Sequence, residues 1–186
     1  PSMDSMSTKN EKLNQLGRIK FLDQKTNTFV KIYRSNILKD DFNQILKRVS
    51  IINSFVKYDL SIPLTRVVID KDEIVVSQKY LKKSARLTDI PKHKRTKLIV
   101  DLELTIATLH SIGFVHGDIN HKNIIYSENK LWLVDFEPSL IQMKKGKKKW
   151  MVSRPYAFPE DLKNKDVTTA TDVYAFDCFK KWFIGV

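Results

Sequence analysis

The sequence is poor in glycine and cysteine. None of its five glycines has the spacing of a G-x-G-x-x-G dinucleotide fingerprint or a G-x-x-x-x-G-K phosphate loop, which excludes a Rossmann dinucleotide-binding protein and a P-loop NTPase. The lone cysteine, Cys178, excludes an internal disulfide and any metal site built from several cysteines. No apolar run approaches the roughly 18 residues that cross a membrane. The polar first residues, PSMDSMSTKN, are unlike a signal peptide. We therefore expect no membrane span.

Basic residues, in contrast, are abundant. The 186 residues include 33 Lys and Arg against 21 Asp and Glu, a formal net charge of +12. Such an excess suits an anionic partner, such as a nucleotide, a nucleic acid, an anionic lipid or an acidic protein. Apolar residues make up 42% of the chain, enough for a folded core, and the length fits one domain or two small lobes.

The hydrophobic pattern alternates between strand and helix signals. Within residues 40–58, apolar side chains recur at the helical period through Phe42, Ile45, Leu46, Val49, Ile52 and Phe55. Short runs rich in β-branched and aromatic residues predict strands. In chain order, we expect strands at 18–22 and 28–34, a helix at 40–58, strands at 64–69 and 73–79, a helix at 94–111, strands at 123–126 and 131–135, and a helix at 171–183. This order predicts an α+β fold with two lobes.

Polar side chains flank the second predicted hairpin. Asp118 follows a helix, Asn123 stands at the start of the hairpin, and Asp135 stands at its end. A hairpin returns its two ends to one place, so the three side chains should converge. An amide with a carboxylate suits Mg²⁺, and a further carboxylate can orient an attacking hydroxyl. The alternative is that Asp118 and Asn123 only shape turns.

This segment resembles the catalytic and metal-binding loops of the protein kinase-like superfamily. In HGDINHKN, the pattern H-R-D-x-x-x-x-N matches His116, Asp118 and Asn123, and in DFE the pattern D-F-G matches Asp135 and Phe136. The resemblance implies that Asp118 is the catalytic base and that Asn123 and Asp135 hold Mg²⁺ on the phosphates of ATP.

The resemblance extends toward the N-terminus. TFVKIYR resembles the strand that carries the nucleotide-binding lysine, which makes Lys31 the candidate for the α- and β-phosphates, against the alternative of a solvated strand lysine. IVVSQKYL resembles the strand and hinge behind the adenine. There Gln78 takes the gatekeeper place, and Lys79, Tyr80 and Leu81 offer hinge backbone.

The resemblance also extends toward the C-terminus. VSRPYAFPEDL resembles the end of an activation segment, with residues 158–160 in place of A-P-E, and Asp172 resembles the aspartate that anchors the catalytic loop. The implied fold is two-lobed, with a small β-rich N-lobe and a truncated helical C-lobe. We expect a flexible tail at 1–16, the N-lobe at 17–81 and the C-lobe at 82–186.

Two departures from the family concern the nucleotide lysine. No glycine-rich loop precedes Lys31. Residues 42–58 contain no acid that could pair with Lys31, and Gln44 is the nearest polar substitute. These departures leave open a pseudokinase that only binds.

Other departures lie in the catalytic and metal-binding loops. Gly117 replaces the arginine that reads a phosphorylated activation segment, and Glu137 replaces the glycine of D-F-G. Asn120 stands where protein-serine/threonine kinases place a phosphate-contacting lysine, a role that Lys122 could take over.

The function implied is an ATP- and Mg²⁺-dependent protein kinase that phosphorylates Ser or Thr. The 25-residue step from Asp135 to Glu160 matches a peptide-docking activation segment, and Ser153 falls where Ser/Thr kinases carry a residue bonded to the catalytic aspartate. The alternatives are a small-molecule kinase of the sugar, aminoglycoside or choline type, and a pseudokinase binding module.

A run of lysines, MKKGKKKW at 143–150, lies within this segment. Such a run is ordinarily a solvated loop; beside a substrate groove it would favour an acidic protein substrate. The net charge permits a nucleic-acid partner, but no binding motif supports one. We expect a cytoplasmic enzyme, with a secreted effector acting in a host cytosol as the alternative.

Overall fold

The computed structural model describes residues 12–14, 18–54, 61–135 and 168–185. The chain folds as two compact units, one made of Pro1–Val56 with Leu64–Tyr80 and the other of Lys57–Pro63 with Leu81–Val186. The first unit is β-rich and the second is mainly helical, which gives the α+β fold predicted from the sequence. Relative to the expected lobes, residues 57–63 and Leu81 lie in the second unit.

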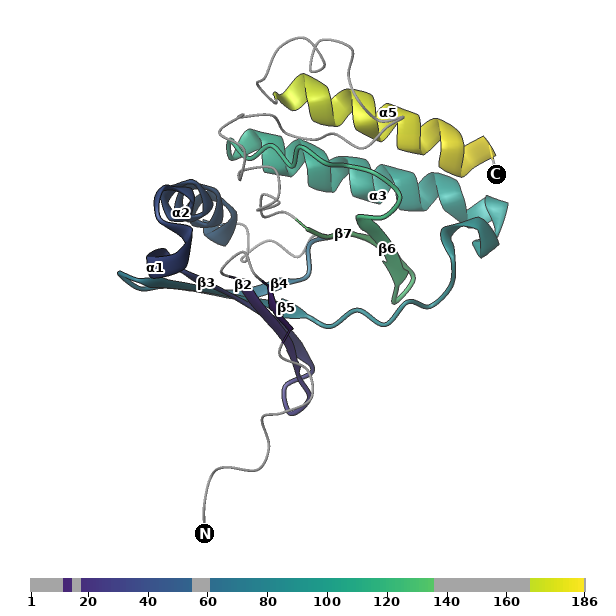
Figure 1. The fold of residues 1–186 in the computed structure, drawn as a ribbon. Helices are drawn as coiled ribbons and strands as arrows, with labels where there is room; N and C mark the ends of the chain where they lie inside the picture. The colour runs from purple at the N-terminus through teal and green to yellow at the C-terminus, as the bar shows by residue number, and fades with distance from the viewer. Residues whose placement is uncertain (1–11, 15–17, 55–60, 136–167, 186) are drawn as a thin grey trace. The chain divides into compact units, whose positions relative to one another are not determined.

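The first unit is built on an antiparallel five-stranded sheet in the order β1-β2-β3-β5-β4 (Figure 1). Its strands are β1 (Lys12–Asn14), β2 (Arg18–Asp23), β3 (Thr28–Arg34), β4 (Leu64–Ile69) and β5 (Glu73–Lys79). Four of them match the predicted strands. The structure differs at β1, which pairs with β2 inside the segment expected to be a flexible tail. β1 is only three residues long and is held to β2 by backbone hydrogen bonds, so its side chains form no pattern that predicts a strand.

Two helices follow β3, the short α1 (Ser35–Leu38) and the longer α2 (Asp40–Asn53). Of the apolar positions predicted for this helix, four are buried and Leu46 is half-buried, and α2 lies against the sheet at β4. On the sheet, Tyr33, Ile74 and Val76 are buried as well. Burial of these side chains supplies the core of the first unit. The predicted continuation of α2 beyond Ser54 falls on residues 55–60, outside the described residues.

The second unit contains two long helices and a hairpin. Its elements are the 3₁₀ turn η2 (Leu87–Asp89), the helix α3 (Lys92–Ser111), the strands β6 (Ile124–Ser127) and β7 (Lys130–Leu133), and the helix α5 (Thr169–Gly185). The two helices lie side by side, and β7 packs against α3 (Figure 1). Leu102, Leu133 and Phe179 are fully buried among the core residues of this unit.

A C-terminal cap ends α3 and sets the start of the following loop. Gly113 has φ +82°, in the left-handed region that favours glycine. Its N–H donates to the His110 carbonyl at 3.0 Å, and the N–H of Phe114 donates to the Leu109 carbonyl at 3.0 Å. These two bonds form a Schellman motif, which satisfies helix carbonyls and turns the chain sharply.

Ser61 explains why residues 57–63 belong to the second unit. Its N–H donates to Thr105 Oγ1 on α3 at 3.2 Å, and its carbonyl accepts from the N–H of Leu133 on β7 at 2.8 Å. Ser61 and Thr105 are both buried, so these polar groups are satisfied inside the unit.

Arg95 on α3 is only 4% exposed. Its guanidinium donates to the carbonyls of Ile90 at 2.8 Å, Phe183 at 2.8 Å and Thr88 at 3.0 Å. One buried side chain therefore ties the start of α3 to the preceding loop and to the end of α5.

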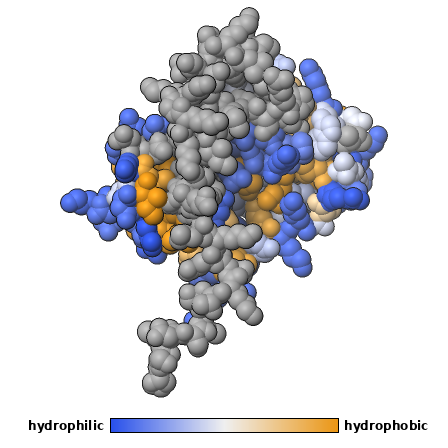
Figure 2. Space-filling model, viewed as in Figure 1, coloured by the Kyte–Doolittle hydropathy of each residue, from blue (hydrophilic) through white to orange (hydrophobic). Residues whose placement is uncertain are grey.

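Hydrophilic residues spread over much of the face seen in Figure 2, with hydrophobic residues between them. Among the described residues, none of the helices has the length and apolar character to cross a membrane.

Candidate active site

The loop between α3 and β6 carries the polar cluster expected from the sequence. Asp118 is half-buried, whereas Asn120 and Asn123 are 2% and 7% exposed. The Nδ2 group of Asn120 donates to Oδ1 of Asp118 at 2.9 Å. The Nδ2 group of Asn123 donates to Oδ2 of the same carboxylate at 3.1 Å. Each carboxylate oxygen thus accepts one amide hydrogen, which fixes the orientation of Asp118.

The β6–β7 hairpin brings the two ends of the candidate metal-binding sequence together. The N–H of Val134 donates to the Asn123 carbonyl at 2.9 Å, which extends the ladder by one pair beyond Ile124 and Leu133. Asp135 comes directly after this pair. It has φ +57°, in the left-handed region, where aspartate is among the tolerated residues.

The donors at this end of the hairpin fit Mg²⁺. The Nδ2 group of Asn123 donates to Asp118, so the Oδ1 atom of the same amide faces away from Asp118. In the described part of the chain, this Oδ1 atom accepts no hydrogen bond. Asp135 is exposed and adds a carboxylate. An amide oxygen and one carboxylate are a typical protein contribution to Mg²⁺, which takes its other ligands from phosphates and water. No group of three His, Cys, Asp or Glu side chains suited to a metal occurs within the described ranges.

His116 connects the loop to the end of β7. The N–H of Asp118 donates to His116 Nδ1 at 3.2 Å, and Nε2 of the same ring lies 2.8 Å from the Val134 carbonyl. A carbonyl only accepts, so Nε2 carries the hydrogen and Nδ1 is the acceptor. These two bonds together require the neutral ring with its proton on Nε2.

Asp172 anchors the loop from α5, as the resemblance implied. It is 1% exposed, and its carboxylate accepts the N–H groups of His116 and Gly117, both at 2.8 Å. Gly117 has φ +84°, a conformation that favours glycine at this place.

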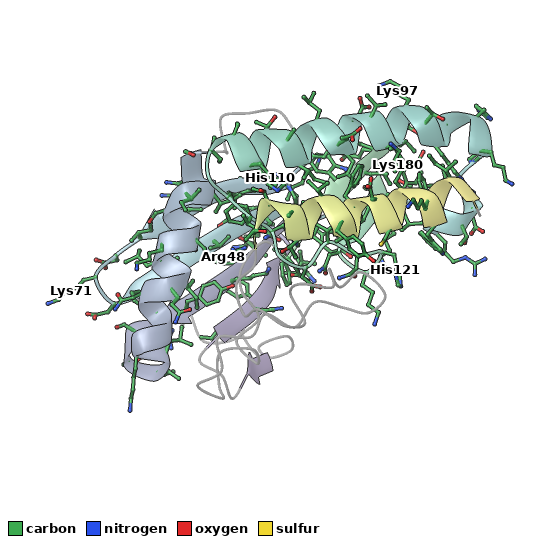
Figure 3. All side chains as sticks on the ribbon, turned by 90° about the horizontal axis from the view of Figure 1, so that it is seen from above. Arg48, Lys71, Lys97, His110, His121 and Lys180 are labelled. Carbon is green, nitrogen blue, oxygen red and sulfur yellow. The ribbon has the colours of Figure 1, made fainter. Side chains whose placement is uncertain are left out.

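Sequence reasoning missed the part that His110 plays. It lies where α3 and α5 meet (Figure 3), with Nε2 2.8 Å from Oδ2 of Asp172. The helical spacing within α3 does not reveal a partner that is 62 residues away. His121, the other labelled histidine, has its ring centroid 5.6 Å from that of Trp182 on α5, with the two rings tilted by 37°.

In the first unit, the nucleotide candidates share one face of the sheet. Lys31 pairs with Val76, and Phe29 pairs with Gln78, so the side chains of these four residues project to the same side. Lys31 is 1% exposed, and its ammonium lies 5.9 Å from the ring centroid of Phe29. The alternative of a solvated strand lysine is wrong, because the side chain is buried.

Gln78 is 5% exposed, and its Nε2 atom has no hydrogen-bond partner in the described part of the chain. After it, Tyr80 is exposed and its N–H donates to the Asn27 carbonyl at 3.0 Å, so this N–H is already occupied. Lys79 ends β5, and Leu81 begins the second unit.

The other residues singled out in the sequence lie either outside this cluster or outside the described residues. Gln44 is exposed on α2. Phe136, the lysine run at 143–150, Ser153 and residues 158–160 lie outside the described residues. Lys31 belongs to the first unit and Asp118 to the second.

Comparison with known proteins agrees with this arrangement. A family model described as the protein kinase domain matches residues 18–180. The serine/threonine-protein kinase PDK1 of Cryptococcus neoformans var. grubii is 28% identical over 89 residues, which cover 43% of this chain and 7% of that protein. The KEOPS complex subunit Bud32 of Pyrococcus abyssi is 27% identical over 94 residues, which cover 49% of this chain and 42% of that protein.

The chain therefore matches less than half the length of either relative. The family model, in contrast, covers most of its residues, including β3, the Asp118 loop and the β6–β7 hairpin. With its two units and its polar cluster in the expected order, the chain belongs to the protein kinase domain family.

Proposed function

We propose that the chain is an ATP- and Mg²⁺-dependent protein kinase that transfers the γ-phosphoryl group of ATP to a Ser or Thr hydroxyl of a protein. The main support is the carboxylate of Asp118, which two amides hold in place beside the hairpin that carries Asn123 and Asp135. Phosphoryl transfer requires positioning and charge stabilisation more than covalent chemistry from the protein, and this cluster offers both.

Each residue then has a defined task. Asp118 orients the substrate hydroxyl and accepts its proton as the oxygen attacks the γ-phosphorus and ADP departs. Asn123, through Oδ1, and Asp135, through its carboxylate, would hold Mg²⁺, which neutralises phosphate charge when bound. Lys31 would contact the α- and β-phosphates. The backbone of Lys79 and Leu81 would bind adenine, with Gln78 behind it. The occupied N–H of Tyr80 makes that residue the weakest of the hinge candidates.

The choice of a protein substrate draws on the family and on one relative. The family model describes protein kinases, and one relative is named a serine/threonine-protein kinase. The expectation of an acidic substrate depends on the lysine run at 143–150 and stays a prediction.

Transfer of radiolabelled γ-phosphate tests the proposal. Wild type, Asp118→Ala and Asp135→Ala are incubated with Mg-ATP, once alone and once each with a generic acidic and a generic basic protein. We expect labelled Ser or Thr with wild type, more on the acidic protein, and none with either variant. Asp177→Ala, which removes an exposed aspartate of α5, is the matched control and should keep wild-type labelling.

Other outcomes would contradict the proposal in different ways. ATP turnover that only a metabolite mixture stimulates would replace it with a small-molecule kinase. If Mg-ATP causes no thermal shift and no label appears, the chain is a pseudokinase module. Retained labelling in Asp118→Ala would overturn the role of Asp118.

A further inference from the structure

We propose that Asn120 is a positioning residue that holds the catalytic carboxylate of Asp118 through an uncharged hydrogen bond. This inference rests on the proposed function, because it gives Asp118 the role of base. The family resemblance assigns to this position a lysine that contacts phosphate. In this chain the neutral side chain instead faces the base itself.

Both ends of the Asn120 side chain are engaged within the loop. Its Nδ2 group donates to the Asp118 backbone carbonyl at 3.1 Å and to Oδ1 of the Asp118 carboxylate at 2.9 Å. Its Oδ1 atom accepts the N–H of Lys122 at 2.9 Å. With only 2% of its surface exposed, Asn120 is an internal part of the loop and not a surface side chain.

The bond to Oδ1 supplies what Asn123 alone cannot. Asn123 holds the other oxygen of Asp118, Oδ2. A carboxylate held at one oxygen can still rotate about its Cβ–Cγ bond, and this rotation moves the lone pair that must face the substrate hydroxyl. A second donor on the opposite oxygen fixes the carboxylate plane. Small misplacements of a catalytic group lower the rate strongly.

The two ends of Asn120 can be tested separately. If Asn120 only shapes the loop, the bond from the Lys122 N–H to its Oδ1 atom is the important one. The substitution Asn120→Asp keeps an acceptor of the same size for that N–H, but it replaces the donor facing Asp118 with a carboxylate oxygen. Asn120→Asp also loses the bond from Nδ2 to the Asp118 backbone carbonyl but keeps the bond to Lys122, whereas Asn120→Ala loses both. A purely structural role therefore predicts that Asn120→Asp retains more activity than Asn120→Ala. A positioning role predicts the reverse order.

Steady-state phosphorylation should give that reverse order. We expect Asn120→Ala to lower kcat about tenfold and Asn120→Asp about a hundredfold, with KM for ATP within about twofold of wild type. Asn129→Asp makes the same chemical change in the β6–β7 turn, where Asn129 accepts from Tyr126, and should keep wild-type kcat. In an Asp118→Ala background, Asn120→Asp should cause no further loss. Wild-type kcat in Asn120→Asp would overturn the proposal.

A second measurement needs no activity. In ¹H–¹⁵N spectra, the side-chain amide signal of Asn120 should shift in Asp118→Ala and stay unchanged in Asp177→Ala. If the signal does not shift, the contact is absent and the inference fails, even when the wild-type enzyme is active. If wild type transfers no phosphate but the signal shifts, the contact exists and the proposed function is what fails. Thermal unfolding of each variant identifies any loss that comes from misfolding.

Discussion

The side chain of Asn123 is joined to Asp118 by two hydrogen bonds from one nitrogen. Nδ2 donates to the Asp118 backbone carbonyl at 2.8 Å and to its carboxylate at 3.1 Å. These bonds set which way the amide faces. Its nitrogen lies toward the Asp118 carboxylate, so its oxygen faces away from it. Under the proposed function, base orientation and metal binding thus depend on the same side chain.

Asn123→Ala should therefore impair both properties. We expect a loss of kcat of about a hundredfold and a higher Mg²⁺ concentration for half-maximal phosphorylation, since one metal ligand is missing. Titration of the phosphorylation rate with Mg²⁺ measures the second effect. Asn129→Ala, in the β6–β7 turn, is the control and should leave the Mg²⁺ dependence unchanged. An unchanged Mg²⁺ dependence in Asn123→Ala would contradict the metal role.

Asp135 combines a left-handed backbone with the proposed metal carboxylate. Asn adopts this backbone about as readily as Asp, whereas Ala does not. Asp135→Asn should thus keep wild-type stability and lose phosphorylation. Asp135→Ala should lose phosphorylation and also about 1 kcal/mol of unfolding free energy. Equal destabilisation by both variants in urea melts would show that the carboxylate itself, and not the backbone, matters for folding.

Asp172 should be important for folding as well as for the loop. In Asp172→Asn, an NH₂ group must face one of the N–H groups that the carboxylate accepts from His116 and Gly117. A buried donor left without an acceptor is costly, so we expect the free energy of unfolding to fall by about 3 kcal/mol. Asp177→Asn, on the exposed side of the same helix, should change it little. Chemical denaturation compares them, and equal midpoints would refute the anchoring role.

Arg95 and Arg86 allow a second comparison between a buried side chain and an exposed one. Arg95→Ala strips three carbonyls of a buried donor, and we expect a loss of about 3 kcal/mol. Arg86 is exposed and paired with Asp89 at 2.9 Å, and this contact raises the pKa of its guanidinium. Exposed pairs contribute little, so Arg86→Ala should leave Tm unchanged. A similar Tm for both variants in calorimetry would be the contrary result.

The buried Nε2 group of Gln78 has no hydrogen-bond partner within the described residues. Replacing Gln78 with an apolar side chain should therefore stabilise the nucleotide-free protein. We expect Gln78→Leu to raise the free energy of unfolding by about 1 kcal/mol. Gln44→Leu, on the exposed face of α2, should not. If adenine is held by hinge backbone, the dissociation constant for ATP in Gln78→Leu should stay near that of wild type in calorimetric titration. A drop in stability would indicate that the amide has a partner.

The sequence predicted the elements with strong local patterns. The period of α2, the β-branched and aromatic residues of β3 and β5, and the β6–β7 hairpin with its polar ends all match the structure. These features depend on residues close together in the chain, where spacing is a direct physical signal. The positions of Asp118 and Asn123 followed from the same hairpin.

The remaining features depend on distant partners. His110 and Asp172 are 62 residues apart, and Arg95 reaches Phe183 across 88 residues. Neither histidine nor arginine at these places carries a local signature of burial. From the sequence, Asn120 was identified only as the residue at the place of the phosphate-contacting lysine. Its hydrogen bond to Asp118 depends on the loop conformation, which the sequence does not reveal.

The placement of Ser61 has a consequence for synthesis on the ribosome. The first unit has all its strands once residue 80 has been made, and units of this kind fold from the N-terminus first. Ser61 has been made by then, but its partners Thr105 and Leu133 follow 44 and 72 residues later. Residues 61–63 must therefore wait, tethered to a folded sheet, until the second unit forms around them. Dividing the chain at residue 81 would therefore separate residues 61–63 from the second unit, to which they belong.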